Sequence, residues 1–60
     1  MNLNEEVSEE VSFRLADGRV LKSVPELIEA LKNMPEWVYK YHVNEEKNDF
    51  VNWINFLSNN

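Results

Sequence analysis

The chain contains no cysteine, and for a sequence of only 60 residues this absence limits the available folds more than any other feature. A chain of this length buries only about 60% of the surface that its unfolded form exposes. Very small folds therefore often depend on disulfides or on thiolate metal sites, and neither can form here. Stability must come from packing, for which the sequence offers large aromatic side chains, each able to bury roughly 150–250 Å². These are Phe13, Trp37, Tyr39, Tyr41, Phe50, Trp53 and Phe56.

The negative charge of the chain is concentrated at its N-terminus. The formal net charge is −5, and four of the negative charges belong to Glu5, Glu6, Glu9 and Glu10. This polar composition cannot bury enough surface to offset the loss of chain entropy. We therefore expect residues 1–10 to form an acidic flexible tail and residues 11–60, with a net charge of −1, to form a single α+β domain.

Composition and patterning argue against several classes of protein. The first residues lack the basic start and apolar stretch of a secretory signal. No apolar run approaches the roughly 20 residues of a transmembrane helix. The six lysines and arginines are scattered, whereas binding to nucleic acid requires clustered basic residues. We therefore expect a cytoplasmic protein that does not bind a membrane and does not bind nucleic acid directly.

The domain begins with the pattern of a β-hairpin. Apolar and polar side chains alternate around Phe13 and Leu15, as in a strand with one buried face. Gly18, the only glycine, follows an aspartate and suits a turn that needs positive φ. The turn is either of type I′ or of type I with a bulge, and the bulged form is preferred because it pairs Phe13 with Leu21 and Leu15 with Arg19. Because an isolated hairpin is barely stable in water, we expect this one to pack against helices.

The first helix is predicted from its capping residues. Ser23 is expected as N-cap, followed by a first-turn proline and by Glu26, whose carboxylate reaches back to the cap amide. The proline at position 35 disfavours helical geometry at Met34, so the helix is expected to end at Asn33 or Met34. The apolar residues that follow the cap at helical spacing are Leu27, Ile28, Leu31 and Met34.

Two more helices are predicted in the C-terminal half. Asn33, Pro35 and Glu36 repeat the arrangement of capping residue, proline and glutamate, which places a second helix there with Trp37, Val38 and Tyr41 as its inner stripe. The last helix is capped by Asn48 or Asn44, and its apolar residues follow the i, i+3, i+4, i+7 spacing. These are Phe50, Trp53, Ile54 and Leu57. The sequence therefore predicts an α+β fold in which one N-terminal β-hairpin packs on about three short helices.

The segment from His42 to Ile54, HVNEEKNDFVNWI, carries a family resemblance. It resembles the signature of a small family of unknown function, met in archaeal and bacterial proteins and often found as an accessory module at the end of longer chains. The pattern is H-x-N, N-D-F and N-W-[IV], and Val51 stands where members often have alanine. Supporting matches lie at Leu15 to Arg19, Ser23 to Leu27, and Met34 with Pro35. The resemblance covers about residues 13–57 and implies a fold unit without implying an activity.

Four polar residues before and at the start of the last helix form the candidate site, namely His42, Asn44, Asn48 and Asp49. Exposed amides at a helix start favour an anionic group. A carboxylate at position 49 would already satisfy these amides and would repel an anion. We therefore favour a structural role, in which Asn48 or Asp49 caps the helix, Asn44 shapes the turn and His42 forms hydrogen bonds across the junction. A binding site for a partner is the alternative.

Catalytic and metal sites are not expected. One histidine with one nearby aspartate falls short of a typical metal site. There is no cysteine, and no serine lies in the sequence context of an activated nucleophile. We therefore expect no enzyme and no cofactor.

Two functions remain open. The first is a small non-enzymatic protein-interaction or regulatory module that binds a protein partner or a second copy of itself. Tyr39 and Phe56 are candidates for its contact surface, because each lies off the main apolar stripe of its helix and aromatic residues are favoured at interfaces. The tryptophans are expected mainly in the core. The second function is a small-ligand sensor built on the polar cluster around His42 and Asn48.

Overall fold

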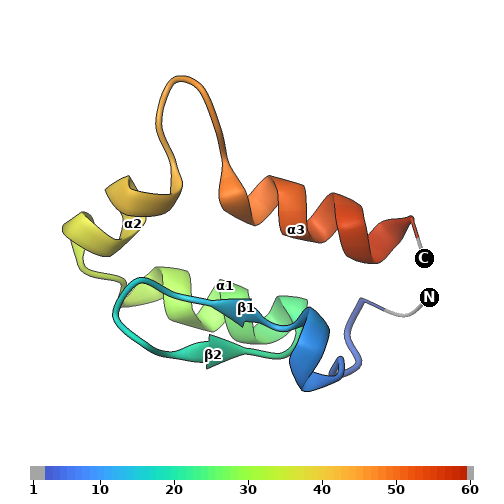
Figure 1. Ribbon diagram of the computed structural model, residues 1–60. Coiled ribbons are helices and arrows are strands. Elements are labelled where there is room, and N and C mark those ends of the chain that lie inside the picture. Colours follow the sequence, from blue (N-terminus) through green and yellow to red (C-terminus); the bar gives the residue numbers. More distant parts are fainter. Residues whose placement is uncertain (1–2, 60) are drawn as a thin grey trace.

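The computed structural model describes residues 3–59. In chain order it contains a short 3-10 helix η1 (Glu9–Val11), strands β1 (Phe13–Arg14) and β2 (Val20–Leu21), and helices α1 (Val24–Lys32), α2 (Glu36–His42) and α3 (Asp49–Ser58) (Figure 1). The predicted α+β fold, with an N-terminal hairpin and three helices, is confirmed. Within residues 3–59 the helices are too short, or too polar, to cross a membrane.

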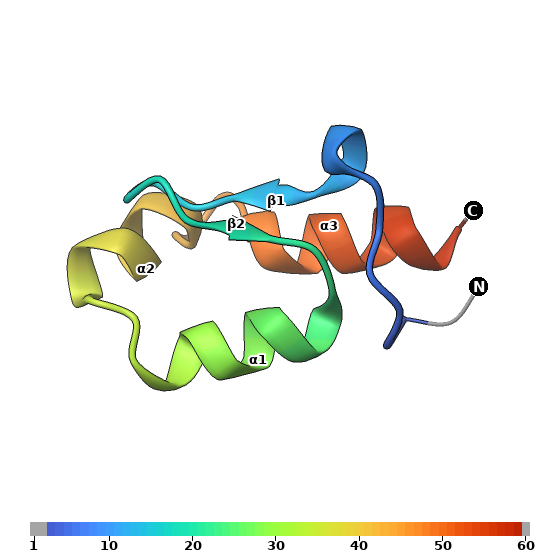
Figure 2. The ribbon, with the colours of Figure 1, turned by 90° about the horizontal axis from the view of Figure 1, so that it is seen from below.

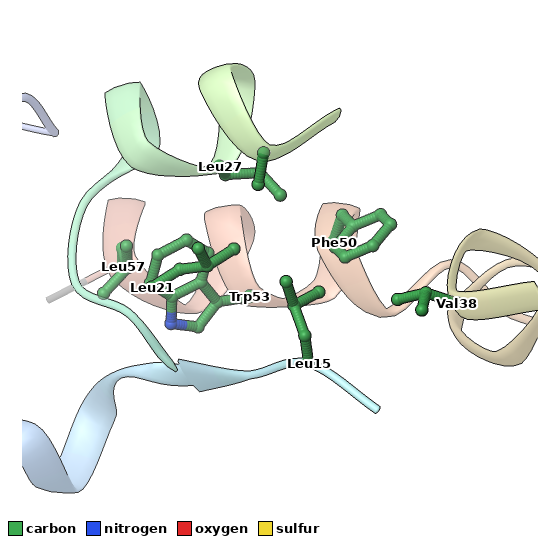
Figure 3. Packing of buried hydrophobic residues seen from close by; sticks show 8 residues of the cluster. Leu15, Leu21, Leu27, Val38, Phe50, Trp53 and Leu57 are labelled. Atoms are coloured by element: carbon green, nitrogen blue, oxygen red, sulfur yellow. The ribbon is translucent and has the colours of Figure 1, made fainter. Parts of the chain in front are cut away.

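The hairpin, α1 and α3 form three sides around one core (Figure 2). The core side chains come from all three sides, and Val38 of α2 joins them at one end (Figure 3). The N-terminal segment lies at the opposite end of the molecule, near the end of α3. The buried hydrophobic residues are Leu15, Leu21, Leu27, Ala30, Val38, Phe50, Trp53 and Leu57.

The hairpin has the predicted register and turn. Phe13 lies opposite Leu21 in the antiparallel pair, and the Leu15 amide donates to the Arg19 carbonyl at 2.8 Å. Gly18 has φ of 97°, and its amide donates to the Leu15 carbonyl at 2.9 Å, which closes the turn. A glycine at this position therefore determines the pairing of the two strands.

Helix α1 begins as predicted, but its first-turn glutamate makes a different bond. The Ser23 hydroxyl oxygen accepts a hydrogen bond from the Glu26 amide at 3.3 Å. The Glu26 carboxylate reaches the Lys22 amide at 3.1 Å and the Ser23 hydroxyl at 3.3 Å, so the predicted bond to the cap amide itself is wrong. Of the apolar residues at helical spacing, Leu27 is buried together with Ala30, whereas Ile28 is 53% and Leu31 40% exposed.

Helix α2 differs most from the prediction. Pro35 is its N-cap and makes no side-chain capping bond, whereas Asn33 is the C-cap of α1, so the predicted second capping arrangement is wrong. Trp37 and Tyr41 are 59% and 63% exposed, and the buried residues are Val38 and His42. The physical reason is that this short helix closes one end of the core and contacts it with a single face. Trp53, by contrast, lies in the core as predicted.

Residues 3–10 pack against the domain, whereas residues 1 and 2 lie outside the described residues. Leu3 and Val7 are partly buried against the core, and the Val7 amide donates to the Lys22 carbonyl at 2.7 Å. Directly after this segment, the Val11 carbonyl accepts a hydrogen bond from the Trp53 indole N–H at 2.8 Å. The glutamates of this segment remain exposed. The boundary at residue 10 and the flexibility of the segment stay predictions, but these contacts differ from those of a solvated tail.

Candidate functional site

His42 is a buried histidine at the end of α2, with only 4% of its surface exposed. Its Nε2 atom lies 3.0 Å from the backbone nitrogen of Ala16, and its Nδ1 atom lies 3.0 Å from Oδ2 of Asp49. A backbone N–H can only donate, so Nε2 is the acceptor and the neutral ring carries its proton on Nδ1. That proton is donated to the Asp49 carboxylate. One imidazole thus joins the hairpin turn, α2 and the start of α3.

Aromatic rings surround the His42 imidazole. The Phe13 ring centroid lies 5.0 Å away in an edge contact, and the Phe50 centroid lies 5.3 Å away. These distances fall in the range at which aromatic pairs stabilise a fold. The imidazole is therefore both a hydrogen-bonding group and part of the aromatic core.

Asp49 is the first residue of α3, and it accepts hydrogen bonds from two sides. Its Oδ2 atom lies 3.0 Å from His42 Nδ1 and 3.0 Å from Lys47 Nζ. The hydrogen bond from His42 is the largest cause that lowers the pKa of Asp49 from its usual 3.8; partial burial opposes this effect, and the bond and charge of Lys47 add to it. Asp49 is therefore a carboxylate at neutral pH.

Asn44 and Asn48 hold the connection between α2 and α3. The side-chain oxygen of Asn44 accepts from the amides of Glu46 at 2.8 Å and Lys47 at 3.1 Å, which fixes the turn. The side-chain oxygen of Asn48 accepts from the Val51 amide at 3.1 Å and caps α3. The two asparagines therefore have the local roles typical of this residue in turns and at helix starts.

The structure thus brings His42, Asn44, Asn48 and Asp49 together at one junction, with their polar groups bonded within the chain. A histidine that acts as general base needs a ring nitrogen within reach of a substrate, but Nε2 of His42 is bonded to a backbone amide. Residues 3–59 contain no group of three histidine, aspartate or glutamate side chains placed to hold a metal ion. The arrangement is suited to fixing the path of the chain.

The two aromatic candidates lie on different helices. Tyr39 on α2 is 43% exposed, and its ring centroid lies 6.2 Å from that of Phe50. Phe56 on α3 is 51% exposed. Helix α2 and the C-terminal half of α3 lie at opposite ends of the molecule, so the structure does not bring these two residues into one surface (Figure 1).

A second aromatic surface was not predicted from the sequence. Trp37 and Tyr41 are four residues apart on α2, so they lie on one face of the helix. Lys47 Nζ lies 5.5 Å from the centroid of the Tyr41 ring. We call Trp37 and Tyr41 the α2 aromatic face. The buried side of α2 carries Val38 and His42, which lie about 100° round the helix from Trp37 and Tyr41. The i, i+4 spacing of both pairs is the sequence feature that separates these two neighbouring faces.

The chain was compared with models of protein families, with curated proteins and with solved structures, and none of the three comparisons found a match. The resemblance of the segment from His42 to Ile54 to a small family of unknown function therefore stays a prediction.

Proposed function

We propose that this protein is a non-enzymatic interaction module that binds a protein partner or a second copy through the α2 aromatic face. We further propose that it acts in the cytoplasm and binds neither membranes nor nucleic acid. The single observation that carries the proposal is the exposure of Trp37 and Tyr41, at 59% and 63%, on one side of a short helix.

The energetics favour a contact on this face. The buried core is built without these two side chains, and apart from the edge contact of Tyr41 with the His42 ring, most of their large apolar surface stays in water. Burial of apolar surface is worth roughly 25 cal/mol per Å². Tryptophan and tyrosine are also enriched among the residues that dominate binding energies at interfaces. A partner that covers the face would gain this energy.

The small-ligand sensor is the weaker proposal. A ligand at His42, Asn48 and Asp49 would have to replace hydrogen bonds that hold the hairpin and two helices together. Loss of a buried hydrogen-bond partner costs about 1–3 kcal/mol. A small module with marginal stability would lose much of its folding free energy on such binding.

Site-specific photo-crosslinking in the native cells tests the interaction proposal. Benzoylphenylalanine at position 41 is expected to form a covalent adduct with a protein, and the mass of the adduct distinguishes another protein from a second copy. The matched control is the same group at position 56, an exposed aromatic position at the other end of the molecule. Trp37→Ala in the same chain should abolish the adduct at position 41 while circular dichroism shows an unchanged fold. Equal adducts at both positions, or none at position 41, would contradict the proposal.

A further inference from the structure

We infer that the partner presents a lysine or arginine side chain to the α2 aromatic face, so that the partner is a cationic segment of another protein. The inference rests on the proposed function and specifies the chemistry of the partner. Two observations support it. The ammonium group of Lys47 lies over the Tyr41 ring, and the net charge around the face is negative.

The Tyr41 ring already receives an ammonium group from its own chain. Lys47 Nζ lies 5.5 Å from the ring centroid, within the distance of a cation–π contact. Trp37 lies one helical turn earlier on the same face, and tryptophan is the side chain that attracts cations most strongly. Among residues 3–59, its indole has neither a ring contact nor a hydrogen bond, so the face offers a second ring to a cation from outside.

The charge around the face is negative. Between positions 36 and 49 the sequence has four carboxylates and two lysines, which leaves a local net charge of −2. Lys40 is paired with Glu36 at 3.1 Å, and Lys47 with Asp49 at 3.0 Å.

The remaining two carboxylates belong to Glu45 and Glu46, which are exposed and lie on the turn that carries Lys47. Neither forms an ion pair within the described part of the chain.

A positively charged partner therefore complements this surface. Opposite charges steer association and suppress binding of partners with the wrong sign. The whole chain, with a net charge of −5, adds to the attraction of a cationic segment and repels an anionic one. A neutral apolar partner would use the aromatic rings but would gain nothing from the carboxylates.

Two matched peptides separate these cases. The probes are an acetylated, amidated peptide of alternating glycine and arginine, and the same peptide with citrulline, which keeps the shape and removes the charge. Binding is followed by amide NMR shifts and by acrylamide quenching of tryptophan fluorescence. Quenching reports on Trp37, because Trp53 is only 8% exposed. We expect the arginine peptide to shift resonances of α2 and the following turn, and to bind at least about tenfold more tightly than the citrulline peptide.

Four variants refine the test. Trp37→Ala should weaken binding of the arginine peptide by about three- to tenfold, whereas Phe56→Ala should leave it unchanged. Lys47→Gln should strengthen binding, because it removes one positive charge and uncovers the Tyr41 ring. Lys40→Gln makes the same change of charge but has no ring contact to release, so it should strengthen binding less. Thermal unfolding of each variant checks that the fold is retained.

The outcomes distinguish this inference from the proposed function. Equal binding of the arginine and citrulline peptides, or no binding of either, would overturn the cationic partner. The interaction module would still stand if the photo-crosslink at position 41 persisted. Absence of that crosslink in the chain that retains Trp37 would overturn the module itself.

Discussion

His42 contributes to the fold through both of its ring nitrogens. One accepts from the Ala16 amide and the other donates to the Asp49 carboxylate, while the ring lies against Phe13 and Phe50. A buried polar group is tolerated because its hydrogen bonds are satisfied, and removal of one partner leaves another buried group without a bond. This single side chain therefore fixes the positions of the hairpin turn, the end of α2 and the start of α3 relative to one another.

Asp49 gives the fold a defined dependence on pH. Its pKa lies below the usual 3.8, chiefly because His42 donates to it and also because Lys47 lies beside it. The folded chain thus binds this proton less readily than the unfolded chain. The stabilising contribution of Asp49 is complete above 3.8 and is lost as the pH falls through the lowered pKa.

Asp49→Asn should remove this contribution while retaining a hydrogen-bond acceptor for His42. We expect the variant to be less stable by about 1 kcal/mol at neutral pH, because it loses charge-assisted bonds. The difference from the natural chain should shrink below about pH 4. Urea unfolding at a series of pH values measures both effects, and parallel stability curves for the two proteins down to pH 2 would contradict the assignment.

At the scale of elements, the hairpin was predictable because a single residue determines it. Gly18 has φ of 97°, and a Cβ at this position would meet no atom within 4 Å, so the requirement for glycine is one of backbone conformation alone. A type I′ turn would need positive φ at two central residues, whereas among residues 3–59 only Gly18 has it, as in the bulged turn. The bulged turn determines which residues of the two strands face each other. Helix α3 was predictable from its spacing, since Phe50, Trp53 and Leu57 lie on one face and are buried there.

Gly18→Ala should lower the free energy of unfolding by about 1 kcal/mol, since an alanine is strained at positive φ. Gly18→Asn should cost less, because asparagine tolerates this conformation better. Chemical denaturation of both variants gives the comparison. An alanine variant as stable as the natural chain, or one more stable than the asparagine variant, would be inconsistent with a turn governed by φ.

Helix α2 shows why part of the site was not predictable. Apart from the charged pair of Glu36 and Lys40, its seven residues contain two pairs at i, i+4 spacing, Val38 with His42 and Trp37 with Tyr41, and either of these two pairs can face a core. Hydrophobicity alone predicts that the aromatic pair is the buried one. His42 is buried instead because it forms hydrogen bonds with Ala16 and Asp49, and these bonds exist only in the folded chain. The structural role of the polar cluster was predicted, whereas the exposed face of α2 was not.

At the scale of the whole molecule, the N-terminal segment takes part in the fold. Leu3 and Val7 lie against the core, and the Val7 amide is bonded to the Lys22 carbonyl. Their exposed neighbours are acidic, and this composition led to the prediction of a flexible tail. Two apolar residues among polar ones are too few to indicate packing without knowledge of the surface they meet.

Removal of residues 2–8 should therefore lower the free energy of unfolding, by about 1–2 kcal/mol for two partly buried apolar side chains. Thermal unfolding of the truncated and full chains measures the effect. The matched control is Glu5→Gln with Glu6→Gln in the full chain, which should alter stability by less than about 0.5 kcal/mol. A truncated chain as stable as the full one would show that residues 3–8 are indeed dispensable for folding.

The central claim is that α2 has an inner face for folding and an outer face for a partner, and two neighbouring residues test it directly. His42→Ala should lower the free energy of unfolding by about 2–4 kcal/mol, because it removes buried contacts and leaves the Ala16 amide without a bond. Tyr41→Ala should lower it by only about 1 kcal/mol, because it removes one edge contact with the His42 ring and the contact with Lys47, and should abolish the crosslink from position 37 to the partner. The measurement is urea unfolding of both variants, with the photo-crosslink at position 37 in the Tyr41→Ala chain. A stable His42 variant, or a Tyr41 variant that unfolds or still forms the crosslink, would contradict this division of roles.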